Sequence, residues 1–200
     1  MHRKLLLNFL VDSVMKHSSA ISLFLFIFLI VGCQSKVSKP LSIDDIDFKT
    51  TDASEIFFKN VRQSYYDKQE IKAAGMDIFR MSDRNIEADY PLIHLAIAYN
   101  WRNDQAFLMV EPNDKVINQE SFTILGIDGV KNDTLVIEYS MGNMKDQVAF
   151  AHKLYQSITS DQNLLIQIND EDEVIFDKFE DREVLRKTML DYYKLIEVSP

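Results

Sequence analysis

PLIHLAIAYNWRNDQAFLMVE, residues 91–111, contains two apolar runs on either side of a short polar connection. The run at 91–99 is continuous and opens with a proline, as expected of a buried central strand. The run at 105–111 predicts a second strand, and the polar residues 101–104 have the composition of a hairpin connection. This stretch therefore predicts a β-hairpin inside a sheet.

Other apolar runs bounded by turn residues predict more strands, and they lie at 75–81, 122–129, 133–139, 163–168 and 174–176. The segment 55–67 is ambiguous, because its apolar residues have helical spacing whereas its aromatic and β-branched content favours a strand. We favour the strand.

Two amphipathic helices are expected in the C-terminal half of the chain. In 142–159 apolar residues recur at intervals of three and four, and Asn143 is a candidate N-cap with Asp146 three residues later. A second stripe of this kind runs from Val184 to Ile196. Strands followed by interspersed helices predict an α+β domain, with a mainly antiparallel sheet covered on one face by the helices.

The charge of the chain limits its partners. The formal net charge is −9, and residues 1–32 carry three basic side chains and one acidic one, so the remainder is at −11. Nucleic acid and anionic lipid would both be repelled by such a surface. The sequence therefore argues against either as the main partner.

The apolar run from Ala20 to Val31 has the length of a secretory signal. Its 12 residues would span about 18 Å as a helix, short of the roughly 30 Å hydrocarbon core of a membrane. Lys16 supplies the basic start if translation begins at Met15, and we expect residues 1–32 to be a signal peptide. An uncut anchor helix is the alternative, but Asp12 and Lys16 would interrupt it.

The end of this run, Ile30-Val31-Gly32-Cys33, resembles the lipobox of bacterial lipoproteins, and Cys33 is the sole cysteine. The resemblance implies cleavage between Gly32 and Cys33, a diacylglyceryl thioether on the Cys33 thiol and an acyl chain such as palmitate on its amine. Such chains make an anchor effectively permanent. Gln34 in place of aspartate implies the outer membrane, and the basic segment 35–39 implies a domain facing the periplasm.

Residues 33–54 are polar and are expected to form a lipidated tether, whose residues Ile43, Ile46 and Phe48 dock on the domain. Residues 55–200 are expected to form a single globular α+β domain. The pattern of 55–111 is similar to that of uncharacterised lipoproteins of flavobacteria and other Bacteroidota. That similarity brings no known activity, so it assigns no functional residues.

Few residues suggest chemistry. Trp101 and Arg102 are residue types favoured at protein interfaces, and they are the candidate interaction residues. We nevertheless favour the interpretation in which Trp101 caps the core and Arg102 is solvated. His94 and His152 are expected to be structural. The acidic run 169–173 has neither the glycine nor the alternation of a calcium loop and is expected to be a solvated turn, with a weak divalent site as the alternative. We expect no catalytic, cofactor or metal site.

The sequence thus favours a lipid-anchored protein of the bacterial cell envelope that binds a ligand or an envelope protein without catalysis. An envelope hydrolase acting on glycans or peptides, and an immunity or inhibitor lipoprotein, are the alternatives. A flat sheet face or an exposed Trp101 would favour binding, whereas a deep pocket with paired carboxylates, or with His94 exposed within it, would favour hydrolysis.

Overall fold

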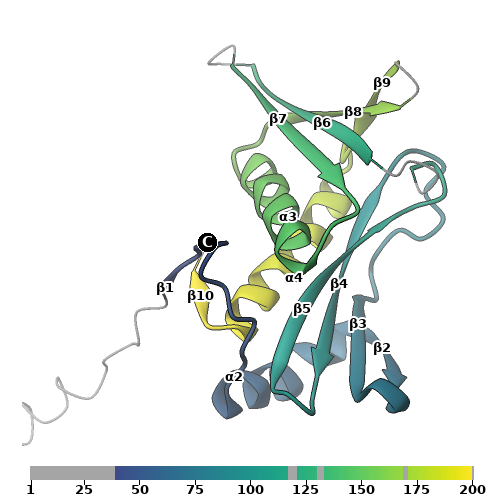
Figure 1. Cartoon of the computed structure of the whole chain (residues 1–200). Helices are drawn as coiled ribbons and strands as arrows, with labels where there is room; N and C mark the ends of the chain where they lie inside the picture. Colours follow the sequence, from purple (N-terminus) through teal and green to yellow (C-terminus); the bar gives the residue numbers. More distant parts are fainter. Residues whose placement is uncertain (1–38, 117–120, 130–132, 169–170, 200) are drawn as a thin grey trace, which may run out of the picture. The chain divides into compact units, whose positions relative to one another are not determined.

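Two four-stranded antiparallel sheets dominate the computed structural model, which describes residues 39–116, 121–129, 133–168 and 171–199 (Figure 1). The expected signal peptide, with Gly32 and Cys33, lies outside the described residues. The first sheet has the order β2-β3-β4-β5, and its strands are Tyr66–Ile71, Met76–Met81, Ile93–Asn100 and Gln105–Pro112. β4 is an interior strand joined to β5 by the turn at 101–104, so the predicted hairpin is confirmed.

The second sheet has the order β7-β6-β8-β9, and its strands are β6 (Ser121–Asp128), β7 (Asp133–Ser140), β8 (Asn163–Ile168) and β9 (Glu171–Ile175). β6 pairs with β7 as a hairpin, and it also pairs with β8, which follows a helix in the chain. The α+β class and the antiparallel pairing are confirmed. The strands divide between two sheets, a division that the apolar runs did not reveal.

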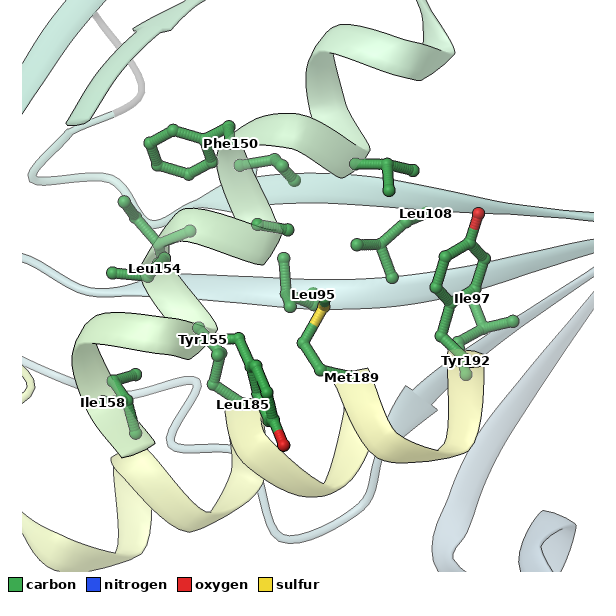
Figure 2. Packing of buried hydrophobic residues seen from close by; sticks show 14 of the residues in the cluster. Leu95, Ile97, Leu108, Phe150, Leu154, Tyr155, Ile158, Leu185, Met189 and Tyr192 are labelled. Atoms are coloured by element: carbon green, nitrogen blue, oxygen red, sulfur yellow. The ribbon is translucent and has the colours of Figure 1, made fainter. Parts of the chain in front are cut away.

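Helices α3 (Met144–Thr159) and α4 (Phe179–Leu195) occupy the expected positions. Asn143 accepts hydrogen bonds from the Lys145 and Asp146 amides, and the Asp146 side chain accepts one from the Asn143 amide, so the predicted N-cap is part of a capping box. The two helices pack against each other and on one face of the first sheet. Figure 2 shows Met189 of α4 pointing toward Leu95 of β4 within this core.

The expected strand at 55–67 is wrong over most of its length. The segment continues a helix, α2 (Asp52–Phe57), through a π-helical turn, η1 (Phe58–Arg62), and a 3-10 turn, η2 (Gln63–Tyr65), before β2 begins at Tyr66. Thr51 caps α2, and its side chain accepts a hydrogen bond from the Ser54 amide. The cap and the burial of Phe58 outweigh the strand preference of the aromatic residues.

Residues 39–54, which the sequence assigns to the tether, pack on the domain. β1 (Lys39–Pro40) pairs in parallel with β10 (Val198–Ser199), near the C-terminus of the described chain. Ile46 is buried in the main core, and Ile43 and Phe48 pack against it, as expected. A backbone bridge between Lys49 and Gln105 extends the edge of β5.

Candidate interaction surface

Trp101 lies at the tip of the β4–β5 hairpin, and its side chain is outside the core, with 42% of its surface exposed. The Arg102 guanidinium stacks 5.2 Å from the centre of the indole ring and donates hydrogen bonds to the Lys72 and Ala73 carbonyls at 3.2 and 3.3 Å. The favoured interpretation, in which Trp101 caps the core, is therefore wrong. Arg102 joins the hairpin tip to the neighbouring β2–β3 turn.

Gly75 makes this contact possible. The glycine has a φ of +66°, and a Cβ atom built on it would lie 2.5 Å from Cδ of Arg102. A side chain at this position would be strained and would displace the arginine. The backbone of the β2–β3 turn thus holds the hairpin tip that carries Trp101 in place.

The two histidines lie in different structural settings. His94 is half-buried on β4, on the face of the sheet away from the helices, and this burial lowers the pKa of its imidazole. His152 on α3 has its Nδ1 2.7 Å from the Tyr193 hydroxyl of α4, and burial lowers its pKa too. His152 therefore joins the two helices, whereas Nε2 of His94 is buried without a hydrogen-bond partner among the described residues.

The acidic run 169–173 differs from the expected turn, because Glu171, Asp172 and Glu173 are the first residues of strand β9. All three side chains are exposed. Residues 169–170 lie outside the described part of the chain. Within that part, no group of three His, Cys, Asp or Glu side chains is arranged to hold a metal ion.

A feature that the sequence analysis missed is a row of apolar side chains across the second sheet. Val136, Leu125, Leu165 and Val174 are direct cross-strand neighbours on β7, β6, β8 and β9 in turn. We call these four residues the apolar row. Side chains along a strand alternate between faces, so the row lies on the face opposite Ile137, Ile124, Leu164 and Ile175, which belong to the core.

The apolar row is open to solvent at both ends. Val136 is 49% exposed and Val174 is 53% exposed, whereas Leu125 and Leu165 between them are half-buried. None of the four belongs to a core cluster or packs against one among the described residues. Neighbouring strands are about 4.8 Å apart, so the row is about 14 Å long. A contiguous row of apolar side chains that reaches solvent on a sheet face is a candidate binding surface.

Polar side chains run beside the apolar row. Two residues further along each strand on the same face, Glu138, Thr123, Gln167 and Asp172 form a parallel row with a carboxylate at each end. Neither carboxylate makes an ion pair with a residue that the structure describes. The face thus combines an apolar centre with carboxylates that form no ion pair within the described part of the chain.

The outer face of the first sheet is also apolar, but its own side chains shield it. Ile78, Ala96 and Ala98 form a small second cluster there and are each buried. Arg80 on β3 and Glu111 on β5 form a two-pronged ion pair, with its shortest N–O distance at 2.6 Å, that reaches across β4 near Ala96. The apolar side chains packed around this cluster, Ile71, Met76, Phe107 and Met109, are each half-buried, whereas the apolar row of the second sheet ends in the exposed Val136 and Val174.

Comparison with known proteins finds no matching family model, no similar curated protein and no similar solved structure. None of the helices in the described residues is long and apolar enough to cross a membrane.

The sequence does carry a signal for the apolar row. β6, β7 and β8 contain adjacent apolar residues in the runs Ile124-Leu125, Leu135-Val136-Ile137 and Leu164-Leu165-Ile166. A strand with one face in the core and the other in solvent alternates apolar and polar residues. Runs of adjacent apolar residues therefore indicate strands that are apolar on both faces. Only the pairing of the strands brings their outward members into one row.

Proposed function

We propose that this protein is a lipid-anchored protein of the bacterial cell envelope, attached through Cys33, whose domain binds another envelope protein without catalysis. The lipobox-like sequence ending at Cys33 supports the anchor, and Gln34 supports the outer membrane. The basic segment 35–39 supports a domain that faces the periplasm. The exposed apolar row carries the binding role. An immunity or inhibitor lipoprotein is one form of this function, and the acidic charge supports it.

Replacing the thiol tests the anchor. Cys33→Ser should abolish incorporation of a labelled fatty acid and leave the uncut precursor, because a serine hydroxyl is too weak a nucleophile to replace the thiolate. The measurement is acyl labelling in growing cells, followed by the mass of the purified chain. Ser35→Ala, two residues away, is the control and should be labelled and cut normally. Continued lipid incorporation into Cys33→Ser would contradict the anchor.

The binding role can be tested by photocrosslinking in intact cells. A photoreactive amino acid in place of Val136 should form a covalent adduct with another protein, because the side chain would lie in the interface. Ile86 is the matched control: it is an apolar side chain that is 69% exposed, in the turn between β3 and β4. Adducts at both positions in equal yield, or at neither, would contradict binding by the apolar row.

A further inference from the structure

The second sheet has an unusual charge content. Its four strands contain no Lys, Arg or His, and they contain six carboxylates: Asp128, Asp133, Glu138, Glu171, Asp172 and Glu173. Basic side chains elsewhere in the described chain form several ion pairs, for example between Arg80 and Glu111 and between Lys68 and Asp77. The strands of the second sheet themselves supply no basic side chain that could pair with these carboxylates.

Two of these carboxylates flank the apolar row on its own face. Glu138 and Asp172 lie at opposite ends of the polar row, one on each edge strand, and both are exposed. Residues two apart along a strand are separated by about 7 Å, so each carboxylate lies within side-chain reach of anything that covers Val136 or Val174. A partner that covers the apolar row must therefore meet negative charge at both ends of the same contact.

We infer that the apolar row binds a cationic protein surface, in which an apolar ridge about 14 Å long is flanked on one side by Lys or Arg. This inference rests on the proposed function and names the chemistry of the partner. Charge complementarity favours it: covering Glu138 and Asp172 with an apolar or acidic surface would leave their carboxylates desolvated without a counter-charge, which is costly. Cations on the partner would pair with these carboxylates, so the site would favour cationic partners over neutral or acidic ones.

The charges also argue against other occupants of this face. A second copy of the chain packed through the same face would bring Glu138 and Asp172 up to a sheet whose strands supply no cation. An anionic lipid surface would be repelled for the same reason. A neutral apolar partner could cover the apolar row but would make no favourable charge interaction with Glu138 and Asp172.

The test uses the full chain with the photoreactive residue at 136 as the probe, in intact cells. Reversing both flanking charges, with Glu138→Lys and Asp172→Lys, should lower the yield of the protein adduct at least about tenfold, because like charges would then face each other. Asp83→Lys with Glu87→Lys is the matched control, since it makes the same change of net charge at exposed residues between β3 and β4. The control should keep the adduct.

A neutral pair, Glu138→Gln with Asp172→Asn, guards against misfolding of the reversed variant and should give an intermediate yield. Circular dichroism of each purified chain checks that it is folded. An adduct that persists at full yield in both flanking variants would overturn the inference while leaving the proposed binding intact. An adduct with the mass of two copies of this chain, or with lipid, would also overturn the inference. Absence of any adduct in the unreversed chain would instead count against the proposed function itself.

Discussion

Leu164→Ala is expected to lower the free energy of unfolding by about 2–5 kcal/mol, whereas Leu165→Ala should lower it by about 1 kcal/mol or less. The two residues are neighbours on β8 and identical in chemistry. Leu164 is 1% exposed and belongs to the main core, opposite Gly126 and Ile175. Truncating it leaves a cavity, whereas truncating Leu165 removes a half-buried side chain from the apolar row.

Denaturant unfolding of the two variants and the unchanged chain measures this difference, provided that the slope with denaturant stays constant. The pair serves as its own control, because the type of side chain, the strand and the number of atoms removed are the same. Leu165→Ala should also reduce crosslinking from position 136, since it removes part of the covered surface. Equal losses of stability would show that both faces of the sheet are packed and would count against the apolar row as a binding surface.

The strands and long helices could be predicted because their signals are local. The 91–111 hairpin contains two apolar runs and a polar turn within one short stretch, and α3 has both its apolar stripe and its capping box within its own residues. Each element can be judged without knowing what packs on it. The α+β class follows from the order of such elements.

The segment 55–67 shows where local pattern misleads. Ile56, Val61 and Tyr65 contribute to its strand-like composition, yet each has about half or more of its side chain exposed in the structure. The buried residues of α2 and η1 are instead Ser54 and Phe58, which are four residues apart and so lie on the same side of the helix. The sequence feature that indicates a helix is Thr51, which can act as an N-cap, followed by the acidic residues Asp52 and Glu55 in the first turn. This helix start lies before the apolar residues of the segment.

The candidate surface could not be predicted because it depends on strand register. Leu125 and Leu165 are neighbours only because β8 returns after α3 to pair with β6. If the register of β8 were shifted by one residue, the side chain of Leu164 would lie in the apolar row and that of Leu165 would point toward the core. Trp101 is different: composition placed it in a polar turn, but only the structure shows that it is exposed and does not cap the core.

Asp191→Ala is expected to lower the free energy of unfolding by about 3–5 kcal/mol, because it removes the shared acceptor of a buried polar network. Arg62 donates from Nε to Oδ1 of Asp191 at 2.7 Å, and the Tyr66 hydroxyl donates to Oδ2 at 2.7 Å. The network joins α4 to η1 and to the start of β2. Burial raises the pKa of Tyr66, and the Asp191 charge raises it further, which keeps the phenol protonated as a donor.

Glu183→Ala provides the control on the same helix, since Glu183 pairs with Arg186 one turn away at 2.6 Å but nearer to solvent. This change should cost no more than about 0.5 kcal/mol. Most of the loss in Asp191→Ala comes from leaving the Arg62 charge without a partner, so adding Arg62→Met should restore part of the stability. Denaturant unfolding of the two single variants and the double variant separates these contributions. Equal costs for Asp191→Ala and Glu183→Ala would show that α4 is held by its apolar face alone. A large cost of Asp191→Ala without recovery in the double variant would show that the loss does not come from the unpaired Arg62 charge.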